Sequence, residues 1–179
     1  MPQAPALESE PDPTVIESAK TLQLPTDYSR CGLSDKARKL AKLILQDDEQ
    51  QRNLVNCNPL LAQLATNQAK ALADAGKVSH FVGGSPNQRL LKAGFPLTEM
   101  DQARDNSVEA ILGGESSADE VWLRFQMSYN HKIHLLGEHE YYLKQTEFAV
   151  GHYYKWHSPH IDYWVVYFAE ADHTANNEQ

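Results

Sequence analysis

Residues 58–76, which read NPLLAQLATNQAKALADAG, predict a long amphipathic helix around which the rest of the fold can be placed. Asn58 is a favourable N-cap because its side chain can accept a hydrogen bond from a free amide of the first turn. Pro59 suits the first helical position, and Gly76 suits the position just past the end. Between them, apolar residues recur at helical spacing. They are Leu61, Leu64, Ala65, Ala69, Leu72 and Ala73.

Further helices are predicted on both sides of this stretch. Residues 34–45 place apolar groups along one helical face, and residues 85–94 begin with Ser-Pro and end with Gly. Ser117 and Glu120 have the spacing of a capping box, in which the two side chains satisfy free amides at a helix start. The helix that follows is expected to carry Val121, Trp122, Phe125 and Met127 on its apolar positions.

Three segments are predicted to be strands. Residues 107–112 end at two glycines, and residues 148–154 and 161–169 are rich in β-branched and aromatic side chains. Residues 156–160 can turn the chain, so the last two strands are expected to form an antiparallel hairpin. Residues 95–105 are expected to be a loop. Helices on both sides of a small sheet predict an α/β fold, a three-layer α-β-α sandwich with a mainly antiparallel sheet.

The composition is typical of one globular domain. The chain has 179 residues, of which 41% are hydrophobic and 22% charged, enough for one substantial core. Residues 1–29 are expected to form a mobile leader, because they contain five prolines and few large apolar groups. Residues 30–171 would form the domain and residues 172–179 a tail.

Charge and hydropathy exclude two classes of partner. The formal net charge of -8 argues against nucleic acid, because binding to a phosphate backbone depends on clustered Lys and Arg. No apolar run approaches the roughly 20 residues that span a bilayer, so no transmembrane segment is expected.

The first residues and the cysteines leave two questions open. The start, MPQAPA, has neither the basic nor the apolar region of a signal peptide, so the protein is either cytosolic or exported with its signal removed. Cys31 and Cys57 are the only cysteines, and their spacing does not match a thiolate zinc site. A disulfide between them and a pair of buried thiols are equally compatible with the sequence.

Seven short motifs follow one another along the chain. They are NPLLAQLA at residues 58–65, SH at 79–80, RLLKAGF at 89–95, VEAILGG at 108–114, FQMSYNH at 125–131, AVGHYY at 149–154 and YWVVYF at 163–168. Their order and spacing over residues 53–170 resemble the CAP superfamily in its bacterial, SCP-like form. This superfamily includes cysteine-rich secretory proteins, insect antigen 5 and plant pathogenesis-related proteins.

The resemblance implies a secreted or periplasmic domain with an open cleft lined by His80, Glu109 and His131. Glu109 matches the acid of the family's strand motif, and Ser128 stands where many eukaryotic members have a second glutamate. Some members bind lipids or sterols. The resemblance therefore implies a non-enzymatic module that binds a small apolar or amphipathic ligand, a peptide or an envelope component.

The chemistry of the same residues suggests an alternative. Two imidazoles and a carboxylate can bind a divalent metal such as zinc, so His80, His131 and Glu109 are candidate ligands of a metal-dependent hydrolase or peptidase. Either histidine alone would more often be a hydrogen-bonded structural residue. Ser128 lies three residues before His131, but a catalytic triad needs a third group that the sequence does not identify.

The environment of the histidines can also be predicted. A carboxylate beside His80 and His131 is expected to raise the pKa of both imidazoles in the metal-free protein. The other six histidines lie in turn or strand contexts that suggest solvated positions. They are His134, His139, His152, His157, His160 and His173.

Overall fold

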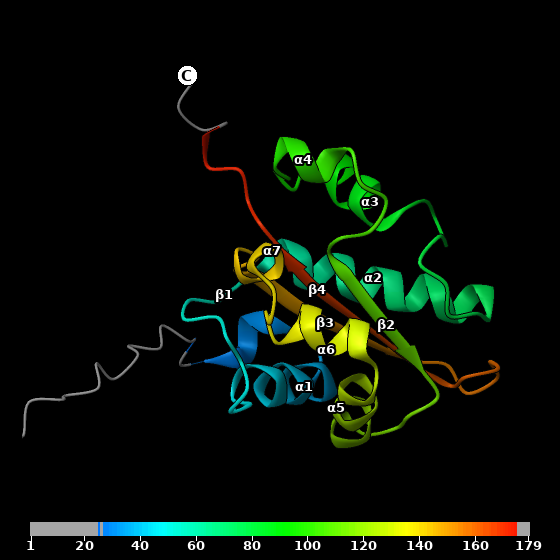
Figure 1. Ribbon diagram of the computed structural model, residues 1–179. Coiled ribbons are helices and arrows are strands. Elements are labelled where there is room, and N and C mark those ends of the chain that lie inside the picture. The colour runs from blue at the N-terminus through cyan, green and yellow to red at the C-terminus, as the bar shows by residue number, and fades with distance from the viewer. Residues whose placement is uncertain (1–24, 26, 175–179) are drawn as a thin grey trace, which may run out of the picture.

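Helices enclose a four-stranded sheet in the computed structural model, which describes residues 25 and 27–174 (Figure 1). The strand order is β1-β3-β4-β2, with β3–β4 and β4–β2 antiparallel and β1–β3 parallel. The predicted α/β fold is confirmed, and its sheet is mixed rather than wholly antiparallel. The strands are β1 (Asn56–Cys57), β2 (Glu109–Gly113), β3 (Glu147–Tyr154) and β4 (Asp162–Ala169).

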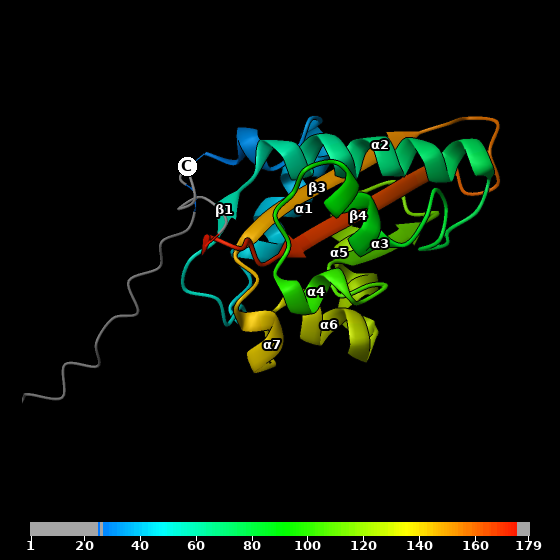
Figure 2. The same cartoon turned by 90° about the horizontal axis from the view of Figure 1, so that it is seen from above.

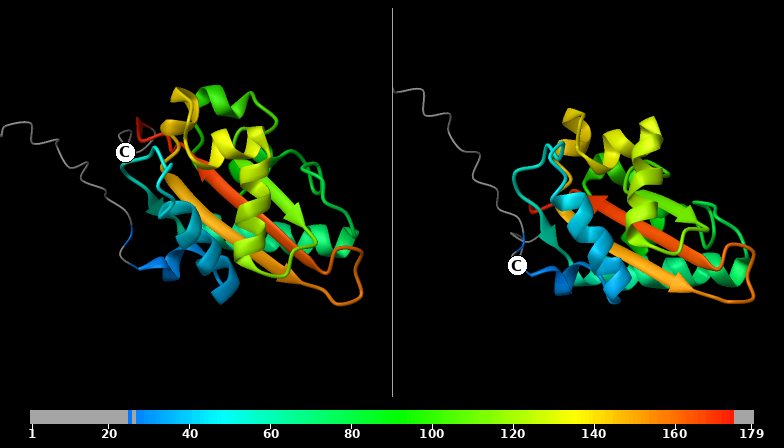
Figure 3. Two further views of the ribbon diagram at one scale, coloured as in Figure 1. Left: turned by 60° about the horizontal axis from the view of Figure 1, so that its bottom comes forward. Right: turned by 90° about the horizontal axis from the view of Figure 1, so that it is seen from below.

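The helices lie on both faces of this sheet. Figure 3 shows α1 and α5 in front of it, and Figure 2 shows α2 running along the opposite side. Most of the predicted leader and the end of the predicted tail lie outside the described residues. The helices are η1 (Tyr28–Cys31), α1 (Asp35–Leu45), α2 (Pro59–Ala75), α3 (Pro86–Lys92), α4 (Glu99–Gln102), α5 (Ala118–Met127), α6 (Tyr129–Leu135) and α7 (Glu140–Leu143).

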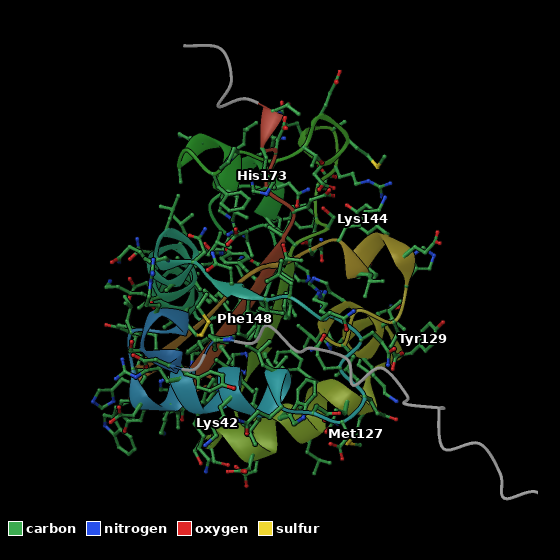
Figure 4. All side chains as sticks on the ribbon, turned by 90° about the vertical axis from the view of Figure 1, so that its left-hand side faces the viewer. Lys42, Met127, Tyr129, Lys144, Phe148 and His173 are labelled. Atoms are coloured by element: carbon green, nitrogen blue, oxygen red, sulfur yellow. A yellow bond between two sulfur atoms is a disulfide. The ribbon has the colours of Figure 1, made fainter. Side chains whose placement is uncertain are left out.

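Strand β4 separates two hydrophobic cores. Every residue of this strand is buried, because successive side chains point to opposite faces and both faces are covered. Trp164, Val166 and Phe168 pack in the core beneath α1, α5 and α6, whereas Tyr163 and Val165 pack against α2. Figure 4 shows Phe148 of the neighbouring strand in the molecular interior. The near-continuous apolar run of β4 is therefore explained by its burial on both faces of the sheet.

Helix α2 has the predicted ends. The Asn58 side chain accepts a hydrogen bond from the Leu61 amide at 3.1 Å, and Gly76 closes the helix in the left-handed region with φ 67°. Its close approach to the sheet depends on Gly151 of β3. A Cβ atom at that position would overlap backbone atoms of Ala65. The glycine thus lets the helix lie directly on β3.

The structure resolves the question of the cysteines. Cys31 and Cys57 form a disulfide with Cα atoms 4.6 Å apart, which joins η1 to β1. Both residues are buried in the core beneath α1. The bond therefore anchors the start of the described chain to the edge of the sheet.

Removing this disulfide is expected to lower the free energy of unfolding by about 3 kcal/mol, because the bond closes a loop with a sequence separation of 26 residues in the unfolded chain. The Cys31→Ala, Cys57→Ala double variant can be compared with the oxidised protein by urea unfolding. Adding reductant should bring the parent protein to the stability of the variant and leave the variant unchanged. Equal stability of the two oxidised proteins would contradict the prediction.

Several elements differ from those expected. The predicted loop at 95–105 contains α4, and the short elements β1, α6 and α7 were not predicted. Met127 is 78% exposed rather than on the apolar face, whereas Val121, Trp122 and Phe125 are buried. At the start of α5 the Ser117 hydroxyl caps the Glu120 amide, but the Glu120 carboxylate accepts from that hydroxyl instead of from a backbone amide. None of the helices in the described part of the chain is long and apolar enough to cross a membrane.

Candidate functional site

Glu109, the first residue of β2, places a fully buried carboxylate beneath a surface cavity. One of its oxygens, Oε2, accepts hydrogen bonds from Arg89 Nη2 and from the Tyr167 hydroxyl, both at 2.8 Å. The other, Oε1, lies 2.9 Å from His80 Nδ1. A buried carboxylate requires such partners because loss of hydration is costly. Three donors thus meet that requirement here.

Arg89 of α3 connects this carboxylate to the loop that carries His80. Its guanidinium donates to the carbonyls of His80 and Gly84, both at 3.0 Å, and to the Tyr167 hydroxyl at 2.7 Å. Burial, and next the charge of Glu109, raise the pKa of Tyr167 well above its usual value. The phenol therefore stays protonated and relays a hydrogen bond from Arg89 to Glu109.

Asn106 fixes the entry of the chain into β2. Its Oδ1 accepts from the Glu109 amide at 2.9 Å, and its Nδ2 donates to the Glu109 carbonyl at 3.1 Å. This local pairing satisfies backbone groups that the sheet leaves unpaired at the strand start. It also holds the backbone from which the Glu109 carboxylate projects.

His80 is oriented by Glu109. Since a carboxylate can only accept hydrogen bonds, the contact from Nδ1 to Glu109 Oε1 requires a proton on Nδ1. In the neutral ring, Nε2 then carries the free lone pair. The His80 side chain is 33% exposed, so the ring reaches solvent while its inner edge is held.

His131 lies on α6 and approaches the same cavity from the other side. Its ring packs edge-to-face on Phe125 with centroids 5.0 Å apart, and its Nδ1 is buried without a hydrogen-bond partner in the described chain. Burial, and next the charge of His80, lower the pKa of His131. The prediction of a raised pKa is therefore wrong for His131, because Glu109 is turned toward His80 and Arg89.

All four predicted site residues line one cavity of about 300 Å³. Ser128 lies between α5 and α6, where its hydroxyl makes no hydrogen bond with another described side chain. Ser128 is therefore not paired with a base in the described part of the chain. Most of the lining is polar. The lining residues are His80, Asn106, Ser107, Glu109, Ser128, Asn130, His131, His134 and Tyr142.

The predicted metal ligands His80, His131 and Glu109 do not form a three-ligand group in the structure. Within residues 25 and 27–174, no three His, Cys, Asp or Glu side chains are grouped so that they could hold a metal ion. Glu109 is the reason for part of this result, because its two oxygens are already engaged by Arg89, Tyr167 and His80. The carboxylate is placed to orient an imidazole rather than to offer an open oxygen.

A larger and more open hollow, of about 570 Å³, lies between the end of α1 and α5. Its central carboxylate, Asp47, accepts hydrogen bonds from Trp122 Nε1 and Gln126 Nε2, both at 3.0 Å. These contacts hold α5 against α1. Because its central carboxylate already serves this packing, we place the candidate site at the smaller cavity.

Two groups of residues were not predicted in the roles that the structure shows. His134 and His152 were expected to be solvated, but His134 is buried, and the His152 side chain is 8% exposed and contacts Asp162 Oδ1 at 2.7 Å. The second group comprises residues that line the cavity or hold the Glu109 carboxylate. They are Arg89, Asn106, Asn130, Tyr142 and Tyr167. Arg89, Asn130 and Tyr167 lie in the motifs RLLKAGF, FQMSYNH and YWVVYF, but those motifs did not indicate these roles.

Buried His134 is expected to make the fold sensitive to acid. Burial lowers its pKa from 6.5 to about 3, so the unfolded chain binds a proton that the native state does not. Its contribution is complete above pH 6.5 and decreases as the pH falls toward 3, by about 1.4 kcal/mol per unit. Between pH 7.5 and 5 this amounts to roughly 2 kcal/mol. His134→Phe should remove that part of the acid slope in urea unfolding.

A matched variant at an exposed histidine tests the specificity of this effect. His157→Phe should retain the full loss of stability between pH 7.5 and 5, because His157 is exposed and the substitution leaves buried His134 in place. His131 and His152 also have pKa values lowered mainly by burial, so some slope should remain in His134→Phe. An unchanged slope in His134→Phe would show that burial does not lower the pKa of His134 in the native state.

Comparison with known proteins adds information about the fold. No family model and no curated protein sequence matches this chain, so the resemblance to the CAP superfamily remains a prediction. Among solved structures, an outer surface protein from Borrelia burgdorferi superposes with a TM-score of 0.54 at 20% sequence identity. The match covers 75% of this chain and 90% of that one. At this identity the two proteins share a fold, and the chain described here is similar to that outer surface protein in architecture.

Proposed function

We propose that this chain is an extracytoplasmic, CAP-like binding protein whose cavity between His80 and His131 holds a small ligand. The observation that carries the proposal is that polar groups in the cavity wall lack hydrogen-bond partners. His131 Nδ1 and the Ser128 hydroxyl have no hydrogen-bond partners within the described chain, whereas the Glu109 carboxylate beneath them is fully paired. Unpaired polar groups above a fixed floor are suited to bind rather than to fill space.

The lining favours a ligand that is polar at its inner end. Asn106, Asn130 and Ser128 offer amide and hydroxyl groups beside the two imidazoles. An amphipathic molecule, a peptide or an envelope component can place amide, hydroxyl or acidic groups against them. A wholly apolar ligand would leave these groups without partners, at a cost of about 1–3 kcal/mol for each buried one.

Two observations support a location outside the cytoplasm. Disulfides persist mainly in oxidising compartments, and Cys31 and Cys57 are bridged. The structurally similar protein from Borrelia burgdorferi is described as an outer surface protein. We therefore propose that the chain is secreted or periplasmic.

A metal-dependent hydrolase is the second candidate. The contact from His80 Nδ1 to a buried carboxylate is the arrangement in which the outer ring nitrogen of a histidine commonly binds zinc. His131 could supply a second nitrogen. In this variant of the proposal, Glu109 acts as the partner of His80 and is not itself a ligand. Catalysis would further need a general base, for which the described residues offer no free carboxylate in the cavity.

NMR titration can distinguish these functions. The side-chain amides of Asn106 and Asn130 line the cavity and report directly on occupancy. Three probes are suitable: zinc chloride, an N-acetylated tripeptide and a short-chain lysophospholipid. Binding is expected to shift both amide signals, and His131→Ala should weaken the response. Hydrolysis of a fluorogenic peptide or a p-nitrophenyl ester with added zinc would support the second candidate instead.

A matched control separates the cavity from other histidines. His157 is exposed on the turn between β3 and β4, outside the cavity. His157→Ala should therefore bind all three probes as the parent protein does. If none of the probes shifts the two asparagine amides, or if His131→Ala responds like the parent, the proposal is wrong.

A further inference from the structure

A further hollow, of about 390 Å³ and separate from the one beside Asp47, continues the cavity of His80 and His131 at its α7 side. The two share three lining residues, Asn106, Ser107 and Tyr142, so they form adjoining parts of one groove. The outer part is lined in addition by Arg104, Ile133, His139 and Tyr141. It therefore changes from the polar lining of the inner cavity to an aromatic wall with one cationic residue.

The aromatic wall is held rigidly. Tyr141 and Tyr142 pack edge-to-face with ring centroids 5.3 Å apart, and Tyr142 also contacts the buried His134 ring at 4.9 Å. The Tyr141 hydroxyl hydrogen-bonds to Asp101, a buried carboxylate that also accepts from Ser107. The phenol rings can therefore offer apolar surface without a loss of side-chain freedom on binding.

Two groups in the outer part can contact an anion. The Arg104 side chain stacks on Tyr141, with its guanidinium carbon 4.9 Å from the ring centroid, and forms no ion pair with any carboxylate of the described chain. His139 Nδ1 accepts a hydrogen bond from the Tyr141 amide at 3.1 Å. In the neutral ring this leaves the proton on Nε2, which is a second donor. The outer lining contains no acidic residue.

We infer that this outer part of the groove is a subsite for the carboxylate end of an extended ligand, a short peptide with a free C-terminus and an apolar last side chain. The inference rests on the proposed function, because the inner end of the same peptide would occupy the cavity of His80 and His131. Arg104 would pair with the carboxylate in the two-pronged geometry that guanidinium groups favour. The apolar side chain would lie on Tyr141 and Tyr142.

The binding of two matched peptides tests this subsite. The probes are an N-acetylated tripeptide ending in phenylalanine, as the free acid and as the C-terminal amide. The parent protein is expected to bind the acid about tenfold more tightly, because a charge-assisted hydrogen bond contributes roughly 1.4 kcal/mol or more. In Arg104→Gln, the affinity for the free acid should fall to the affinity for the amide. Binding is measured by calorimetry, and the Asn106 and Asn130 amides locate it by NMR.

Three further measurements make the result decisive. Arg30→Gln, which changes another exposed arginine outside the groove, should keep the tenfold preference. His131→Ala should weaken the binding of both peptides equally, because it alters only the inner cavity. Phenyl phosphate is the third probe, and binding that depends on Arg104 for this anion but not for the peptide would overturn the peptide assignment.

The two proposals fail in different ways. Equal binding of acid and amide by the parent protein, or an unchanged preference in Arg104→Gln, overturns the subsite and leaves the inner cavity as a binding site. Absence of peptide binding also overturns the subsite. In that case, a response of the Asn106 and Asn130 amides to zinc or to the lysophospholipid would still support the proposed function, and no response would overturn both.

Discussion

Arg52→Met is expected to lower the free energy of unfolding by about 3–5 kcal/mol, although Arg52 lines neither part of the groove that holds the candidate site. The side chain is fully buried and donates to the carbonyls of His134, Leu135 and Tyr142 at 2.8, 3.0 and 3.1 Å. These carbonyls belong to the ends of α6 and α7, where helices leave acceptors unpaired. Methionine would fill the space but remove the charged donor from each carbonyl, leaving neutral donors such as Gly137 N, Gln50 Nε2 and Gln145 N.

The charge of Arg52 adds to this effect. Burial lowers its pKa to about 9, so the guanidinium remains protonated at neutral pH. A cation at helix C-termini interacts favourably with the helix dipole, and the guanidinium carbon also lies 3.7 Å from the Phe168 ring centroid. Arg52 thus joins the segment that carries His131 and Tyr142 to the sheet. Its loss should loosen the cavity wall as well as the core.

Urea unfolding of Arg52→Met, Arg52→Lys and Arg30→Met tests this role. Lysine retains the charge but cannot donate to three carbonyls in the same fixed geometry. The stability of Arg52→Lys should therefore lie between those of the parent protein and Arg52→Met. Arg30→Met changes an exposed arginine and should alter stability by less than about 0.5 kcal/mol. If Arg52→Met does not fold, amide hydrogen exchange in Arg52→Lys should still show α6 and α7 opening first. A methionine variant as stable as Arg30→Met would contradict the prediction.

Much of the fold follows from local patterns in the sequence. The helix at 58–76 has its cap, its proline and its terminal glycine within the segment itself, and the structure confirms all three. The β3–β4 hairpin was likewise predicted, because a run of β-branched and aromatic residues on each side of a turn needs no distant information. Elements whose own residues carry the start, the stop and the periodicity are predictable in this way.

The short elements were missed for a physical reason. Strand β1 has two residues and exists only because it pairs in parallel with β3, about 90 residues away in the chain. Helices α6 and α7 have seven and four residues, too few for a helical period to be recognised. The ends of α6 and α7 are instead fixed by Arg52, whose long-range hydrogen bonds leave no local signal.

The candidate site was predicted only as a set of residues. Spacing and resemblance brought together His80, Glu109, Ser128 and His131, and the structure places all four around one cavity. Which of these side chains contact one another could not be predicted, because the contacts of Glu109 depend on Arg89. That guanidinium draws Glu109 Oε2 away from the imidazoles and leaves His131 in a buried site where its pKa is lowered. A charge partner from a separate helix thus changed the expected electrostatics.

Glu109→Gln is the second substitution with a large expected effect, again about 3–5 kcal/mol, because it leaves the Arg89 charge buried without its carboxylate. Arg89→Met should cost a similar amount by stranding Glu109. The double variant should lose clearly less than the sum of the two, since neither charge then remains unpaired. Urea unfolding of the four proteins gives this coupling energy. The exposed pair Lys39 and Asp119 is the matched control, with a much smaller expected coupling because solvent screens both charges.

The same variants decide what the buried pair does for the site. In the parent protein Glu109 can only accept, so His80 must carry its proton on Nδ1, whereas an amide at position 109 can accept or donate. Glu109→Gln should therefore convert His80 from one tautomer to a mixture, which long-range proton–nitrogen NMR spectra resolve. Arg89→Met should preserve the tautomer while lowering stability. If His80 keeps a single tautomer in Glu109→Gln, the carboxylate serves the packing of α3 against the sheet and does not orient the imidazole at the cavity.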